Sequence, residues 1–200
     1  MKRNAYSAGA VKFAFWFQEF RKEVELLQEG KSFEEIKNLS SEGNLFGTQT
    51  PARSRLIYNT VTKRIKALGD DFYDLYLESD IATQKLFVLS SIMASDTLFF
   101  DFVYEVIREK MLIGSNTFTD ADIRIFFHNK QVQDETAAKW TDQTLNRLGR
   151  TYKAYLCEAG ITDNGKTERK ILKPILDPSF EHWLSDHEMA PIVKALTGEA

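Results

Sequence analysis

Basic and amide side chains at helical spacing are the groups in this sequence with the most informative chemistry. Residues 52–68 contain five bases and no acid, with the apolar period of a helix. The inward row is Ile57, Val61, Ile65 and Leu68. The outward side holds Arg55, Asn59, Thr62 and Lys66, with Arg53 and Lys63 beside them. Arginine and lysine contact phosphates, and asparagine can pair with an adenine edge, so this side predicts a nucleic-acid contact.

A second segment repeats the arrangement. Residues 135–159 are predicted to form a long helix with the core row Leu145, Leu148, Tyr152 and Tyr155. Its opposite row is Lys139, Gln143, Asn146, Arg150 and Lys153, with Arg147 alongside. The turn sequence at 163–165, between residues 161–162 and 170–172, predicts a small β-hairpin. This hairpin carries Lys166, Arg169 and Lys170.

The order of these segments favours two helix-turn-helix-like elements. Each basic helix follows a shorter helix, as a recognition helix does. The second is followed by the predicted basic hairpin, which is the sequence order of a winged helix-turn-helix. We therefore expect two basic helices that contact duplex DNA mainly through its phosphates.

Net charge alone argues against a nucleic-acid binder, because the formal charge is −3. The charges are nevertheless grouped: residues 69–80 hold five acids and no base, whereas residues 139–173 hold eight bases and four acids. Such blocks create positive surfaces, and a polyanion responds to the local field. Duplex DNA is therefore the expected partner. Two alternatives stay open: a non-catalytic adaptor whose basic faces dock acidic partners, and an RNA-binding helical protein.

No set of residues in the sequence has the spacing of a catalytic or metal site. The histidines, at 128, 182 and 187, lack metal-ligand spacing, and the single Cys157 is predicted to be a buried, inert thiol. Asp96 is expected to cap a helix, and Asp101 to be the buried partner of a base such as Arg108 or Lys85. We expect no cofactor, no small-molecule substrate and no enzymatic activity.

The elements that must hold the two basic helices are themselves mainly helical. Predicted helices cover residues 12–29, 32–39, 51–68, 81–94, 96–113, 120–127 and 135–159, followed by two short helices. Ser32 and Glu35 are expected to form a capping box at the second helix, and Thr50 to cap the third. Apolar residues surround the first half of the helix over 96–113, which is therefore the expected buried centre. We place a domain boundary after residue 78, giving domains 1–78 and 79–200. The longest strongly apolar run, Leu86 to Ala94, is far shorter than the roughly 20 residues that span a bilayer. With no secretory signal pattern, a cytoplasmic protein without a membrane partner is expected.

Several stretches together resemble the BrxA family of the BREX bacteriophage-defence systems. They are residues 12–22, 82–87, 96–105, 122–127 and 139–142, in that order along most of the chain. The resemblance implies a helical, DNA-binding accessory protein. Its partners would be double-stranded DNA and the other BREX subunits, which mark host DNA and block phage replication. It implies no catalytic residues, so the site residues above come from the helix faces alone.

Overall fold

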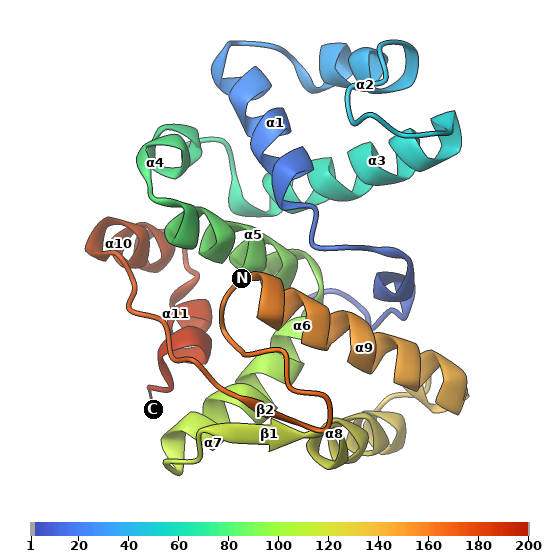
Figure 1. Cartoon of the computed structure of the whole chain (residues 1–200), viewed down its shortest axis with the longest axis vertical. Helices are drawn as coiled ribbons and strands as arrows, with labels where there is room; N and C mark the ends of the chain where they lie inside the picture. The colour runs from blue at the N-terminus through green and yellow to red at the C-terminus, as the bar shows by residue number, and fades with distance from the viewer. Residues whose placement is uncertain (1–2, 200) are drawn as a thin grey trace.

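The computed structural model describes residues 3–199, and within them the chain is mainly α-helical, with a small two-stranded antiparallel sheet (Figure 1). The predicted fold class is confirmed. The elements are η1 (Gly9–Lys12), α1 (Phe17–Gln28), α2 (Phe33–Glu42), α3 (Pro51–Leu68), α4 (Tyr73–Glu78), α5 (Ile81–Ser95), α6 (Thr97–Phe102), η2 (Val103–Arg108), α7 (Glu109–Leu112), β1 (Thr117–Thr119), α8 (Asp120–Gln133), η3 (Ala137–Lys139), α9 (Asp142–Glu158), β2 (Glu168–Lys170), α10 (Pro178–Asp186) and α11 (Ala190–Thr197).

Helix starts lie where local capping signals predict them. Ser32 and Glu35 form the predicted capping box at α2, in which each side chain satisfies a free backbone amide of the other. Thr50 accepts a hydrogen bond from the amide of Arg53 at the start of α3. Asp96 caps α6 by accepting from the amide of Phe99. These contacts satisfy amides that a helix start leaves without a partner.

Helices α5 and α6 form the buried centre, and the other helices pack around them (Figure 1). Helix α3 packs against α5, and Phe87 of α5 lies 5.7 Å from Phe72 and 5.5 Å from Trp183, measured between ring centroids. One apolar cluster therefore includes residues on both sides of position 78. The predicted division into domains 1–78 and 79–200 stays a prediction.

Within residues 3–199, no single helix has the length and apolarity to cross a membrane. Helix α5 and residues 97–112 reach those limits only as a joined pair, and that pair is bent by 111°.

The sheet joins two segments that lie far apart in the sequence. Strand β1 pairs antiparallel with β2, with Phe118 opposite Arg169. The predicted hairpin is present as a single bridge between Thr162 and Ile171 beside β2. Strand β1, which precedes α8, was not predicted from the sequence. The chain order is thus α7, β1, α8, α9, the bridge residue Thr162 and then β2.

Several predicted helix boundaries are wrong, and the helix expected over 32–39 continues to Glu42. The helix expected over 12–29 begins at Phe17, because Trp16 has a left-handed backbone (φ 57°) and the chain before it is extended. The helix expected over 135–159 begins at Asp142, so Lys139 lies in the short turn η3. The helix expected over 120–127 continues to Gln133. The helix expected over 96–113 is divided into α6, the π-helical η2 and α7. Helix α4 was not predicted.

Candidate nucleic-acid interface

Helix α9 presents a polar face to solvent and an apolar face to the core. Thr141 begins it by accepting a hydrogen bond from the amide of Thr144. Leu148 and Tyr152 are fully buried. Of the predicted contact residues, four are exposed on the other side of this helix: Gln143, Asn146, Arg147 and Arg150. Within residues 3–199, neither arginine has an assigned ion-pair or hydrogen-bond partner, so both guanidinium groups are free to bind an anion.

A groove of about 490 Å³ runs between α8 and α9. Asn146 and Arg150 line it from α9. Helix α8 contributes further polar side chains, Arg124, His128 and Gln131, which the sequence analysis did not select. His128 and Gln131 lie beyond residue 127, where the helix was predicted to end, so Arg124 was not recognised as part of a polar face. A period continued to Gln133 would have placed 124, 128 and 131 on one face.

Close packing of α8 on α9 depends on Gly149. A β-carbon at this position would lie 3.0 Å from Cγ2 of Ile123. A larger side chain would have to displace Ile123 or move the two helices apart, because protein interiors leave little free space. The glycine thus sets the spacing between the two walls of the groove.

Arg169 and Lys153, both predicted to contact DNA, are bound inside the protein. The Arg169 guanidinium donates to the carbonyl oxygens of Lys153 (3.3 Å) and Asp163 (3.1 Å). The ammonium of Lys153 donates to Asp120 at 2.6 Å. The Arg169 bonds connect the turn at residues 163–167 to α9, and the pair of Lys153 with Asp120 connects α9 to the start of α8. Arg169 therefore positions the turn and Lys153 positions α9, and neither side chain extends freely into solvent.

Other cations around this turn are exposed. Lys166 lies in the turn and Lys170 in β2. Lys166 and Arg150 line the same shallow depression of about 420 Å³. The structure thus brings Arg150 of α9 and Lys166 of the turn together, and Arg147 is exposed one helical turn before Arg150. We call Arg147, Arg150 and Lys166 the α9 basic surface. Lys170 follows Arg169 in β2, so its side chain points to the opposite face of the strand.

Most of the α3 residues that were predicted to face outward are exposed to solvent, but the prediction for Thr62 is wrong. Arg55, Asn59 and Lys63 are exposed. Thr62 is buried, and its hydroxyl donates to the carboxyl of Glu23 on α1. Helix α1 covers this flank of α3, which the helical period alone could not indicate.

Two further cations of α3 lie over aromatic rings. Arg53 is centred 5.2 Å from the Trp16 ring, and Lys66 Nζ lies 4.3 Å from the Phe33 ring. Both side chains are exposed, so their charges remain accessible while the rings restrict their motion.

Arg64, one of the five bases that define this segment, is buried and structural. Its guanidinium donates to the carbonyl oxygens of Phe15 (2.8 Å) and Ala14 (3.0 Å), and to the hydroxyl of Tyr155 (3.3 Å) on α9. Burial lowers the pKa of Arg64 from its ordinary value. These bonds connect α3 to α9 through the extended segment that precedes α1.

Comparison with known proteins identifies the family. A family model described as BrxA matches residues 4–188. A protein of Bacillus cereus (strain H3081.97) described as "BREX protein BrxA" is 37% identical over 177 residues, which cover 88% of each chain. The chain belongs to the BrxA family. The predicted resemblance is therefore confirmed.

The BrxA-family chain also shares its fold with a solved structure. The crystal structure of an uncharacterized protein from Magnetospirillum magneticum superposes with a TM-score of 0.83. The match covers 98% of this chain and 100% of that one, at 16% sequence identity. At this identity the likeness extends to the fold alone.

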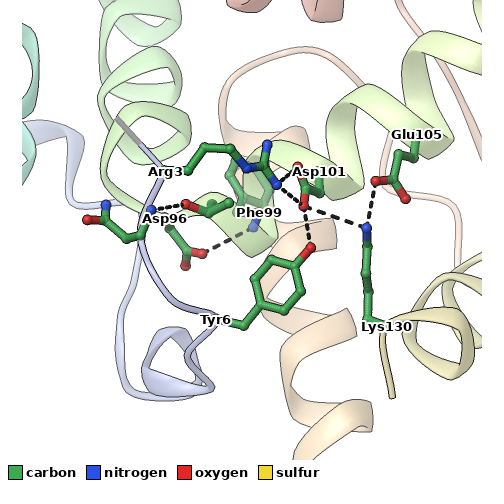
Figure 2. A network of polar contacts seen from close by, with 9 residues as sticks. Arg3, Tyr6, Asp96, Phe99, Asp101, Glu105 and Lys130 are labelled. Carbon is green, nitrogen blue, oxygen red and sulfur yellow. Dashed lines mark hydrogen bonds and ion pairs between the residues drawn. The ribbon is translucent and has the colours of Figure 1, made fainter. Parts of the chain in front are cut away.

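The N-terminal segment of the BrxA-family chain is held by a buried carboxylate, Asp101 (Figure 2). Arg3 donates two hydrogen bonds to it, at 2.9 and 2.7 Å, and the hydroxyl of Tyr6 donates at 2.6 Å. Lys130 lies 3.6 Å from Asp101 and donates to Glu105 at 2.6 Å. The prediction that Asp101 pairs with a base is thus correct in kind, but Arg108 and Lys85 were the wrong partners. Arg108 instead pairs with its neighbour Glu109.

No catalytic or metal cluster was predicted for this BrxA-family chain, and within residues 3–199 no group of three His, Cys, Asp or Glu side chains is placed to hold a metal ion. His187 Nε2 lies 2.7 Å from Asp71, and His182 pairs with Asp186. Cys157 is half-buried rather than buried as predicted, and it forms no disulfide.

Proposed function

We propose that this chain is a DNA-binding accessory component of a BREX phage-defence system. It contacts duplex DNA mainly through phosphates, with α9 as the principal helix and α3 as a second contact. The observation on which the proposal depends is the α9 basic surface, whose two arginines are free within the described part of the chain. Membership of the BrxA family supports the assignment to a BREX system, whose other subunits we propose as partners.

The order of elements around α9 supports a winged helix-turn-helix reading. A strand precedes α8, α9 follows as the recognition helix, and β2 returns to pair with the first strand. The turn at residues 163–167 then corresponds to the wing. In this arrangement, Arg147 and Arg150 bind phosphates beside the groove that α9 enters, and Lys166 binds the adjacent backbone. Gln143 and Asn146 are the side chains suited to base edges.

The other residues predicted to contact DNA are given more limited roles in this proposal. On α3 we retain Arg53, Arg55, Asn59, Lys63 and Lys66 as the second contact. Thr62 is withdrawn because it is buried, and Arg169 and Lys153 become positioning residues. Lys139 remains an exposed residue in the turn before α9, outside the helical row. We assign the chain no catalytic step, because no arrangement among residues 3–199 suggests one.

The salt dependence of DNA binding tests this proposal. The variant Arg147→Ala/Arg150→Ala/Lys166→Ala removes the three cations of the α9 basic surface. Each phosphate contact contributes about −0.9 to the slope of log K against log salt concentration. The slope should therefore become less steep by about 2.7, with weaker binding at low salt. Fluorescence anisotropy with labelled duplexes of unrelated sequence, at salt concentrations from about 50 to 200 mM, measures this change.

A matched variant keeps the change in net charge the same. Arg21→Ala/Lys22→Ala/Lys31→Ala removes three cations from α1 and the turn after it, and should leave the slope close to that of the parent protein. A slope that is the same in both triple variants would contradict the proposal for α9. Replacing Arg55 and Lys63 by Ala tests α3 in the same way. Preferential competition by RNA over duplex DNA would indicate an RNA-binding protein instead.

A further inference from the structure

Helix α8 separates two different surfaces. One side of it lines the groove with α9. The other side, together with η2 and α7, lines a second groove of about 220 Å³, which we call the α7–α8 groove. Its floor is apolar, because Val106 and Phe126 are both buried. Ile113 and Ile125 form its apolar walls.

The walls of this groove carry large apolar side chains that are exposed. Ile113 is 76% exposed and Ile125 is 61% exposed. Val132, seven residues after Ile125 and therefore on the same side of α8, is 75% exposed. Among residues 3–199, half of the exposed large apolar side chains lie on α7, on α8 or at the end of α7. Exposed apolar side chains that gather beside a groove are typical of a protein-interaction site.

The rim of the groove is acidic toward solvent. Glu105 and Glu109 have side chains that are 47% and 53% exposed. The cations that pair with them, Lys130 and Arg108, are only 5% and 8% exposed. These two carboxylates thus face outward while their partners are buried behind them. Lys110 also lines the groove, 27% exposed, but it pairs with Asp122 at 2.8 Å, so its charge is balanced within the rim. Such a rim repels phosphate and attracts lysine and arginine.

The backbone of this wall is also unusual. Residues 103–108 form a π-helical turn, which supplies Glu105 and Val106 to the groove. π-Helical turns are rare and are found frequently at functional sites. The extra residue in the turn changes the direction of the side chains that follow it, and here it separates α6 in the core from the exposed α7.

We propose that the α7–α8 groove binds an amphipathic helix of another protein, with a row of branched aliphatic side chains flanked by lysine or arginine. An apolar cavity of about 150 Å³ can hold benzene, so the groove has room for a leucine, isoleucine or phenylalanine side chain as an anchor. Anchors at steps of three and four residues would follow the row from Ile113 to Ile125 and Val132. The acidic rim of the groove favours lysine or arginine at the flanks of the bound helix. The proposal is independent of DNA binding, since α9 lies on the other side of α8.

Two designed peptides test the groove directly. Each is an amphipathic helix of about 18 residues with the same isoleucine and leucine face, and one has lysine flanks whereas the other has glutamate flanks. Fluorescence anisotropy with the full chain should detect binding of the lysine peptide and about tenfold weaker or no binding of the glutamate peptide. Failure of the chain to bind the lysine peptide, or equal binding of the two peptides, would overturn the proposal.

Variants of the protein locate the binding. Ile113→Ser/Ile125→Ser should weaken binding of the lysine peptide about tenfold or more, because the apolar walls are lost. The matched control Ile81→Ser removes an exposed isoleucine (59% exposed) from α5 and should leave peptide binding unchanged. Glu109→Lys should weaken the lysine peptide and strengthen the glutamate peptide. Peptide binding that survives in the double isoleucine variant excludes this groove.

Two further measurements separate the remaining outcomes. Sedimentation velocity of the parent chain detects a concentration-dependent dimer. If such a dimer forms and Ile125→Ser dissociates it, the occupant is a second copy and the proposed partner is wrong. DNA binding by the double isoleucine variant should remain at the parent level, so that failure at the groove and failure at the α9 basic surface are distinguishable.

Discussion

Replacing Glu23 by glutamine should change how the stability of the protein depends on pH. Glu23 is fully buried on α1 beneath α3. One carboxyl oxygen accepts from the Thr62 hydroxyl, and within residues 3–199 the other has no hydrogen-bond partner. Burial raises the pKa of Glu23 from 4.5 to about 8, despite the opposing effects of Thr62 and of Lys66. The carboxyl is therefore protonated in the folded protein near neutral pH.

The sign and size of the effect follow from this pKa. A raised folded-state pKa means that the folded state holds the proton more tightly than the unfolded chain does. The stabilising contribution is complete below the unfolded pKa of 4.5, and it is lost as pH rises to about 8. The loss is about 1.4 kcal/mol per pH unit in this window. Between about pH 5.5 and 7.5, the parent protein should lose about 3 kcal/mol relative to Glu23→Gln, which cannot ionise.

Urea unfolding followed by tryptophan fluorescence measures the effect at each pH. The free energy of unfolding of Glu23→Gln, minus that of the parent, should rise by about 3 kcal/mol across the window. His187 also has a raised pKa, because its ring bonds to the Trp183 carbonyl and to Asp71, and it acts in the same direction. It is present in both proteins and cancels in the difference. Glu29→Gln, at an exposed position, should show no such rise. A difference that stays flat with pH would refute the reasoning.

Three other variants test packing and positioning. Arg169→Lys keeps the charge but loses the planar guanidinium, so DNA affinity measured by anisotropy should fall about fivefold; unchanged affinity would remove its positioning role. Asp101→Asn leaves Arg3 without its carboxylate and should lower the free energy of unfolding in urea by about 2 kcal/mol, against a smaller loss for Arg3→Ala; the reverse order would contradict the assigned network. Gly149→Leu drives a side chain into Ile123 and should cost about 2 kcal/mol by thermal unfolding; a more stable variant would mean that α8 and α9 are not tightly packed.

The parts of the fold that sequence could predict are those with local causes. Ser32, Thr50 and Asp96 were identified as caps because a hydroxyl or carboxylate at a helix start bonds to an amide three residues later. In each of these caps the partner atoms lie within a few residues of one another. The buried centre was predicted because apolar residues surround the first half of the helix expected over 96–113, which is α6.

The start of α1 had a cause that is far away in the sequence. The aromatic period continues back through Phe13, so a helix from residue 12 was the natural prediction. Arg64 instead captures the carbonyl oxygens of Ala14 and Phe15 and holds them in an extended path. The left-handed backbone of Trp16 then turns the chain into α1. A contact across about 50 positions leaves no local pattern, so the period alone could not locate this boundary.

The candidate interface shows the same limit in its charges. A row of cations in a sequence does not reveal which members reach solvent. Lys153 and Arg169 are held by Asp120 and by backbone carbonyls, and Arg64 is buried. These three bases form bonds within the protein that hold the candidate interface in place, whereas Arg147 and Arg150 remain free to bind phosphate. The two groups differ physically, because a cation held within the fold adds shape but releases no counterion when DNA binds. The salt slope should therefore follow the number of free cations, not the larger number of bases in the segment.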